Sequence, residues 1–154
     1  MLENIATMPI SELPLRDSVQ VPSTATLGAV VDAMHAKRHG AAMVVERGEL
    51  IGIFSERDLI HRVDHADPAW QDLPVAEVMT AMPMIIREDD TVAEALRRMN
   101  VGKRRHLPII RDRSTAVGMI SMRDILSYLA SRFPAHFINL PPDPEHEAHA
   151  PWGG

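Results

Sequence analysis

Two hydrophobic patterns alternate along the chain, and both occur twice in the same order. Apolar residues at every third or fourth position predict an amphipathic helix, and short apolar runs bounded by Gly, Pro or charged residues predict strands. Leu27, Val30 and Met34 lie on the first helical stripe, and Val92 and Met99 lie on the second. The order strand, helix, strand, strand, helix is predicted at 19–21, 27–34, 41–45, 50–54 and 56–63, and again at 83–86, 92–99, 107–110, 116–120 and 122–131.

This duplication predicts the fold. Thr91 follows Thr26 by 65 positions and Asp124 follows Asp58 by 66, so we expect one extra residue after the first helix of the second copy. Each copy is too small to be stable alone, so we predict an α/β (α+β) fold of two repeats packed with pseudo-twofold symmetry and with clefts between them. The expected divisions are repeat 1 at 8–66, a polar linker at 67–74, repeat 2 at 75–133 and a Pro-rich disordered tail at 140–154.

The motif Gly-x-x-Ser-x-Arg-Asp recurs where the last predicted strand of each repeat turns into a helix. It places Ser55, Arg57 and Asp58 in repeat 1 and Ser121, Arg123 and Asp124 in repeat 2. Each Ser is in the N-cap position and each Asp is three residues later, which is close to a capping box. A helix N-terminus can also hold a phosphate, and a carboxylate can accept two hydrogen bonds from a ribose diol. The residues alone leave both interpretations open, a helix cap or a ligand site.

Composition and charge narrow the function classes. Of 154 residues, 45% are apolar and 24% are charged, as in ordinary globular proteins, and the net charge of −5 argues against a protein that coats nucleic acid. There is no cysteine, which excludes disulfides, cysteine nucleophiles and thiolate metal sites and is consistent with a reducing cytosol. No apolar run approaches the ~18 residues of a membrane span, and no secretion signal is recognised, so we expect a cytoplasmic protein without membrane contact.

Four segments of repeat 2 carry a resemblance to a known family. They are Val78-Met79-Thr80, the run Asp-Thr-Val-Ala-Glu-Ala at 90–95, the run Arg-His-Leu-Pro-Ile at 105–109 and the run Gly-Met-Ile-Ser-Met-Arg-Asp-Ile at 118–125. Repeat 1 matches through Thr26-Leu27 and through 52–59. In this order and repetition the chain resembles the cystathionine-beta-synthase (CBS) domain family, in the tandem arrangement called a Bateman module. The resemblance covers roughly residues 8–133.

This resemblance implies a regulatory module and not an enzyme. Such pairs bind adenosine-containing ligands in the clefts between repeats: AMP, ADP, ATP, S-adenosylmethionine and sometimes NAD. None of these is expected to be a required cofactor, and no metal site is expected. The resemblance also implies a homodimer and a further, unidentified protein that the module regulates.

The family's ligand contacts can be carried over residue by residue. The implied nucleotide-binding residues are Asp58, Ser55 and Arg57 in repeat 1, and Asp124, Ser121, Arg123, Arg105, His106 and Thr80 in repeat 2. Each Asp would hold the ribose hydroxyls, and each Ser would lie near ribose or phosphate. The basic run at 103–106 would meet phosphate, and Thr80 together with 82–86 would frame the adenine. Each Arg of the motif would point either at phosphate or at the neighbouring helix.

Repeat 1 departs from the family pattern at two places. Leu13-Pro14-Leu15 stands where repeat 2 has 78–80, and Gly40-Ala41-Ala42 stands where repeat 2 has 106–108. We therefore expect the cleft that contains Asp124 to be better formed than the cleft that contains Asp58.

Two other function classes remain as alternatives. An enzyme would need an activated nucleophile or a general base, and no Ser-His-Asp set or carboxylate pair is placed for catalysis with any specificity. A nucleic-acid-binding or structural accessory protein has support only in the basic run at 103–106, and few aromatic residues are present for base stacking. The preferred nucleotide, the number of occupied clefts and the regulated partner do not follow from the sequence.

Overall fold

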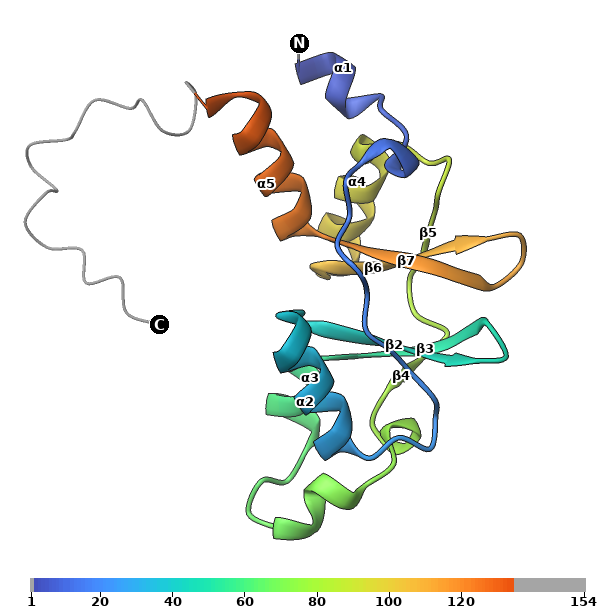
Figure 1. The fold of residues 1–154 in the computed structure, drawn as a ribbon, viewed down its shortest axis with the longest axis vertical. Helices are drawn as coiled ribbons and strands as arrows, with labels where there is room; N and C mark the ends of the chain where they lie inside the picture. Colours follow the sequence, from blue (N-terminus) through green and yellow to red (C-terminus); the bar gives the residue numbers. More distant parts are fainter. Residues whose placement is uncertain (1, 135–154) are drawn as a thin grey trace, which may run out of the picture.

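Each repeat forms one half of the molecule, with its sheet on the inner side and its helices on the outer side (Figure 1). The computed structural model describes residues 2–134, and the tail expected at 140–154 lies outside these residues. One half contains β1 (Gln20–Val21), α2 (Leu27–Lys37), β2 (Ala41–Glu46), β3 (Glu49–Ser55), α3 (Glu56–Arg62) and β4 (Thr80–Ala81). The other contains α1 (Leu2–Ala6), β5 (Ile86–Arg87), α4 (Val92–Gly102), β6 (His106–Arg111), β7 (Thr115–Ser121) and α5 (Met122–Arg132). The predicted α/β fold is confirmed.

Two antiparallel hairpins, β2–β3 and β6–β7, form the centre of the molecule. The strand order is β1-β2-β3-β7-β6-β5, and β4 also pairs with β3. The hairpins meet through β3 and β7, where the backbone N–H of Leu50 donates to the carbonyl of Ser114 at 2.8 Å. Ala41, Met43 and Met119 form a small buried cluster drawn from both hairpins. The two repeats therefore share apolar surface, as their small individual size requires.

The extra residue of the second repeat lies in its hairpin turn. The β2–β3 turn consists of Arg47 and Gly48, whose φ angles of 52° and 80° suit the left-handed positions of a two-residue type I′ turn. The β6–β7 turn consists of residues 112–114. His106 therefore corresponds to Ala41, since each begins its hairpin and pairs with the Ser that ends it. The expected alignment was wrong by one position here, because apolar runs do not show where a turn gains a residue.

Residues 5–13, at the start of the chain and of repeat 1, pack against repeat 2. The backbone N–H of Ile10 donates to the carbonyl of Asp90 at 2.9 Å, and Ile10 is completely buried in the core that contains Ile86 and Met99. Figure 1 shows the start of the chain beside α4 and α5, before it descends to the other half. Apolar spacing predicts that such a segment is buried, but not which of two similar cores covers it.

Residues 73–79, which lead into repeat 2, pack in the same way against repeat 1. The backbone N–H of Val75 donates to the carbonyl of Ala25 at 2.8 Å, and Val75 is completely buried in the core of repeat 1. We call this segment and residues 5–13 the lead segments. The expected repeat boundaries follow the sequence duplication, whereas the packing assigns each lead segment to the opposite half.

Two expected segments differ from the structure. The strand expected at 83–86 is shorter and later, because only Ile86–Arg87 pairs as β5 and Pro83 has no N–H to donate to a ladder. The linker expected at 67–74 contains a short 3₁₀ helix, Pro68–Asp72. A proline at the first helical position favours this turn, since its φ angle is already that of a helix.

A substitution at Ile10 tests the exchange of lead segments. Ile10→Ala removes a fully buried side chain from the core of repeat 2, so it should lower the free energy of unfolding by about 2–5 kcal/mol. Ile60→Ala is the matched control: Ile60 is 67% exposed, and the change should stay within about 0.5 kcal/mol. Chemical denaturation followed by circular dichroism measures both. Two equally small effects would mean that the first lead segment does not stabilise the fold.

Candidate functional site

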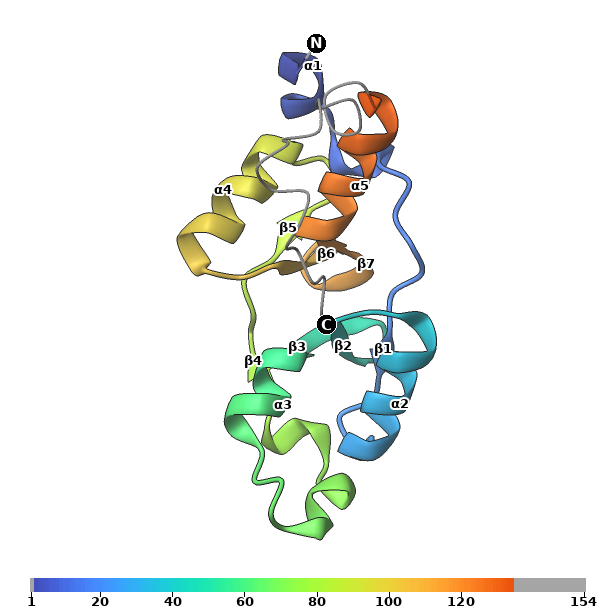
Figure 2. The same ribbon diagram turned by 90° about the vertical axis from the view of Figure 1, so that its left-hand side faces the viewer.

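Two segments cross between the halves on opposite edges of the molecule (Figure 2). Residues 13–19 run from the first lead segment to β1 on one edge, and residues 82–85 run from β4 to β5 on the other. Each crossing segment borders a cleft. The pseudo-twofold axis relates the two edges, so any difference between the clefts comes from the side chains that line them.

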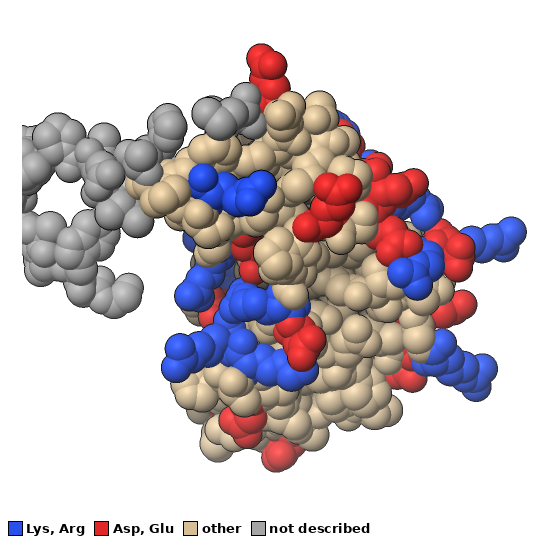
Figure 3. Space-filling view, turned by 45° about the horizontal axis from the view of Figure 1, so that its top comes forward, with Lys and Arg blue, Asp and Glu red and all other residues tan. Residues whose placement is uncertain are grey.

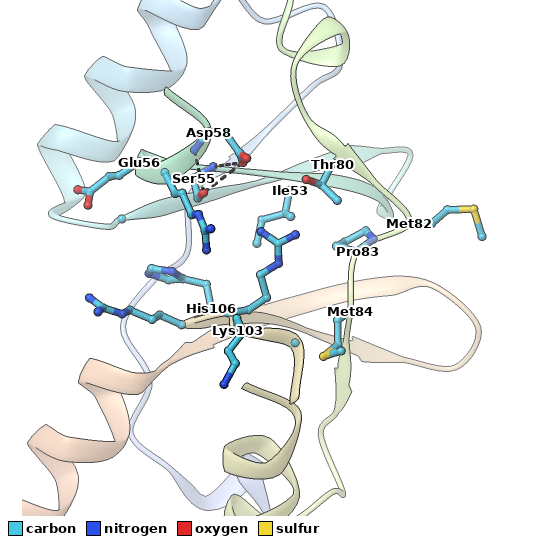
Figure 4. A pocket seen from close by; sticks show the side chains of 15 residues that line it. Ile53, Ser55, Glu56, Asp58, Thr80, Met82, Pro83, Met84, Lys103 and His106 are labelled. Atoms are coloured by element: carbon cyan, nitrogen blue, oxygen red, sulfur yellow. Dashed lines mark hydrogen bonds between the residues drawn. The ribbon is translucent and has the colours of Figure 1, made fainter. Parts of the chain in front are cut away.

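The first cleft, which we call the Asp58 cleft, has a volume of about 480 Å³ and is lined from both halves. Figure 4 shows Asp58, Ser55 and Thr80 on one side and Lys103 and His106 on the other. The full lining is Gly40, Ile53, Ser55, Glu56, Arg57, Asp58, Thr80, Met82, Pro83, Met84, Gly102, Lys103, Arg104, Arg105 and His106. The start of α3, the crossing segment after β4 and the α4–β6 loop therefore meet at one site.

The capping box at the start of α3 holds the Asp58 carboxylate in place. Its Oδ2 atom accepts from the backbone N–H of Ser55 at 2.9 Å and from the Ser55 hydroxyl at 3.1 Å. Ser55 Oγ in turn accepts from the backbone N–H of Asp58 at 3.3 Å. The other carboxylate oxygen, Oδ1, lies 3.5 Å from Arg62 Nε. The cap uses one oxygen and leaves the second with capacity for a further donor, so a cap and a ligand contact are compatible.

Thr80 brings an unpaired hydroxyl to the same cleft. Its Oγ1 atom is buried and has no hydrogen-bond partner within residues 2–134. Thr80 reaches this position because β4 pairs with β3, where Gly52 lies opposite Ala81. A Cβ atom on Gly52 would lie 3.1 Å from the carbonyl oxygen of Thr80 and would displace the Met79 side chain, so glycine favours this close approach. A buried hydroxyl without a partner is unfavourable, and a polar ligand group would satisfy it.

His106 faces the cleft from the other half (Figure 4). Burial lowers the pKa of its imidazole below the usual value, while the carboxylates of Glu56 and Asp124 oppose that shift. The neighbouring His39 and Arg16 lower the pKa further. The neutral imidazole is therefore favoured, and it offers one hydrogen-bond donor and one acceptor.

The second cleft lies at the other crossing segment and has a volume of about 470 Å³. Arg16 and Lys37 line it, but Asp124 does not. Arg16 Nε lies 3.2 Å from Asp124 Oδ1, and the Arg16 guanidinium also donates to the carbonyl of Arg38 at 3.0 Å. Oδ2 of Asp124 accepts from the backbone N–H and the hydroxyl of Ser121, at 2.9 and 2.8 Å. Both carboxylate oxygens of Asp124 are therefore engaged within the protein. Those of Asp58 are engaged too, but its Oδ1 forms only a 3.5 Å ion pair with Arg62, whereas Oδ1 of Asp124 accepts a 3.2 Å hydrogen bond from Arg16.

The two clefts differ in which of the expected site residues line them. Thr80, Arg105 and His106 were grouped with repeat 2, and the expectation left open that a site draws residues from the other repeat; all three line the cleft that contains Asp58. This distribution argues against the expected ranking of the two clefts. The Asp58 cleft brings together Ser55, Arg57, Asp58, Thr80, Arg105 and His106, whereas Ser121, Arg123 and Asp124 do not line it. Ser121 and Arg123 line a neighbouring hollow that shares Arg105 and His106 with this cleft. Pseudo-twofold packing joins the helix start of one repeat to segments of the other, which the linear order of the motifs does not show.

Ser121 and Arg123 line a third hollow, which we call the helix groove. It has a volume of about 1,230 Å³ and lies between α2, α3 and α5. Figure 3 shows Lys and Arg side chains gathered at the left of the view, where the halves meet. Arg16 lines this groove as well and was missed by the sequence analysis. The sequence contains a signal for this residue. At the offset of 65 positions that relates Thr26 to Thr91, Arg16 corresponds to Ala81, so one repeat has a charged residue where the other has a small one.

The described part of the chain contains neither a helix that could span a membrane nor a cluster of metal ligands. No helix in residues 2–134 combines the length and the apolar character that crossing a bilayer needs. No three His, Asp or Glu side chains among the same residues group as the ligands of a metal ion would.

Comparison with known proteins gives one consistent family. The family model of the CBS domain matches the chain twice, at residues 10–65 and 75–131. The CBS domain-containing protein CBSCBSPB1 of Arabidopsis thaliana is 31% identical over 102 residues, which are 66% of this chain and 19% of the relative. The chain thus spans about a fifth of the length of that relative.

Two solved structures share the fold at 28% sequence identity. A CBS-domain containing protein from Agrobacterium tumefaciens aligns with a TM-score of 0.70, over 79% of this chain and 98% of that protein. A CBS domain protein from Pyrobaculum aerophilum, complexed with AMP, aligns with a TM-score of 0.67, over 80% of this chain and 99% of that protein. In both comparisons nearly the whole of the other protein is matched.

Proposed function

The chain belongs to the CBS domain family, and we propose that it is a regulatory module that binds one adenine nucleotide per chain in the Asp58 cleft. The observation that carries the proposal is the meeting, in one cleft, of the Asp58 carboxylate, the unpaired hydroxyl of Thr80 and the basic run at 103–106. The AMP complex of the relative from Pyrobaculum aerophilum supports an adenosine-containing ligand.

Each lining residue has a role in this proposal. Asp58 accepts from the ribose hydroxyls through Oδ1, while its Oδ2 keeps the helix cap. Thr80 bonds to the base or the ribose, and the apolar side chains of Ile53 and Met84 flank the adenine. Arg57 and the basic run bind phosphate, because cations gathered around a hollow favour an anion there.

Asp124 is proposed only as part of a second site that binds the nucleotide more weakly. A nucleotide there would have to displace Arg16 from the Asp124 carboxylate and from the carbonyl of Arg38. That displacement breaks a charge-assisted hydrogen bond, which is the stronger kind. Ser121 and Arg123 belong to this weaker position in the proposal.

A ligand in the Asp58 cleft touches both halves, which gives a physical route to regulation. If the nucleotide binds one arrangement of the halves, or of two chains, more tightly than another, it shifts the population toward that arrangement. The proposed partner is an unidentified cytoplasmic protein that senses the arrangement. In this proposal the chain needs no bound cofactor and performs no reaction.

We also propose that the chain forms a homodimer through the helix groove. Leu126 is 49% exposed and lines the groove with Leu59 and Met122. A second copy would cover this apolar surface around a twofold axis. Val63 and Ile125 do not add to this surface, because they are buried in the cores of their own halves.

Asp58 and Asp124 form a matched pair for testing the site. Both complete the same capping box, so each substitution by Ala should cost up to about 1 kcal/mol of unfolding free energy. Only Asp58→Ala should also weaken ATP and AMP binding, by about ten- to hundred-fold, because it leaves the ribose hydroxyls unpaired. Asp124→Ala should change affinity by less than about three-fold. In titration calorimetry, wild-type affinity in Asp58→Ala would mean that the motif is only a helix cap.

The dimer is tested by light scattering at micromolar concentration. The wild-type chain should show twice the mass of one chain, and Leu126→Glu should halve it, because it would place a carboxylate in the apolar surface that the two copies cover. Val101→Glu is the control, since Val101 is 64% exposed on α4 and lies outside the helix groove. A wild-type chain with the mass of a single copy would end the proposal.

A further inference from the structure

The positive charge around the Asp58 cleft exceeds what a helix cap and a ribose require. Arg57 lies in the first turn of α3, and the run Lys-Arg-Arg at 103–105 follows α4 directly. These four cations line the cleft together with only two carboxylates, those of Glu56 and Asp58. The whole chain has a net charge of −5, so the excess of cations is local. Like charges gathered around a hollow attract anions to it.

These four cations lack partners within the part of the chain that the structure describes. No ion pair or side-chain hydrogen bond joins Arg57 or the run 103–105 to another residue there. Some arginines elsewhere are paired: Arg97 and Arg98 both contact the Glu94 carboxylate at 2.7 Å. The charge of the four cleft cations, which lie together around one hollow, is not neutralised by such contacts.

The backbone places the run 103–105 beside the cleft. Lys103 is the C-cap residue of α4 and adopts the left-handed conformation, with φ 52° and ψ 41°. This conformation ends the helix and turns the chain toward β6, whose first residue, His106, also lines the cleft. The negative end of the α4 dipole favours a cation at Lys103, but this effect falls off within the last turn and does not account for Arg104 and Arg105.

We infer that the Asp58 cleft selects adenine nucleotides by the length of the phosphate chain, and that it favours ATP and ADP over AMP and S-adenosylmethionine. This inference rests on the proposed function. Asp58 and Thr80 bind the nucleoside, which leaves Arg57 and the run 103–105 for phosphate. A triphosphate carries more charge than a single phosphate, spans further and offers more acceptor oxygens, so it can contact more of these cations at once. S-adenosylmethionine brings a positive sulfonium, which these cations repel.

Titration calorimetry of the whole chain with AMP, ADP, ATP and S-adenosylmethionine tests the inference, in about 0.15 M salt and without divalent cations. ATP should bind at least about ten-fold more tightly than AMP, with ADP between them and S-adenosylmethionine weakest. The double substitution Lys103→Gln, Arg104→Gln should bring the affinity for ATP close to that for AMP, while the affinity for AMP falls by less than about three-fold. Arg113→Gln, in the β6–β7 turn, is the matched control and should leave all four affinities unchanged.

The outcomes separate this inference from the function on which it rests. AMP binding as tightly as ATP, or S-adenosylmethionine binding most tightly, would overturn the inference, while a loss of binding in Asp58→Ala would still uphold the proposed function. Failure of all four ligands to bind would remove both. A single-stranded oligonucleotide that displaces ATP at equal phosphate concentration would assign the cations to nucleic acid and would also overturn the inference. Lys103, Arg104 and Arg113 are exposed, so the variants should fold, and thermal unfolding verifies this.

Discussion

The exchange of lead segments between the halves is the constraint on which the rest of the structure depends. Each core is completed by residues from the start of the opposite repeat, with Ile10 buried in one core and Val75 in the other. A half separated from its lead segment would lose part of its core, so the two halves form one folding unit. The exchange also makes the chain cross between the halves at both edges, and the clefts lie along these crossings.

One fold thus builds two clefts of different chemistry. At one edge Gly52 lets β4 approach β3, which brings Thr80 to the cleft and leaves the small residue Ala81 beside it. At the other edge Arg16 stands at the position equivalent to Ala81, and its guanidinium holds the Asp124 carboxylate. The arginine at this position therefore engages the Asp124 carboxylate, although the capping boxes at the starts of α3 and α5 are the same.

Local features of the molecule could be predicted from the sequence, and relations between the halves could not. The helices, the central strands and the capping boxes depend on residues a few positions apart, so spacing and periodicity predicted them. Which core covers Ile10, and which carboxylate lies near Thr80, depends on how the two halves pack together. The sequence does not show this, because the two halves offer similar apolar surfaces. The offset of 65 that sets 13–15 against 78–80 also sets Arg16 against Ala81, and this difference indicated that the clefts differ.

A crystal structure of the chain with ATP would test most directly whether the nucleotide binds in the Asp58 cleft and not beside Asp124. We expect the ribose hydroxyls against Asp58, the phosphates beside the run 103–105, and Arg16 still paired with Asp124. A nucleotide bound against Asp124, with Arg16 displaced and the Asp58 cleft empty, would contradict the assignment of the nucleotide site.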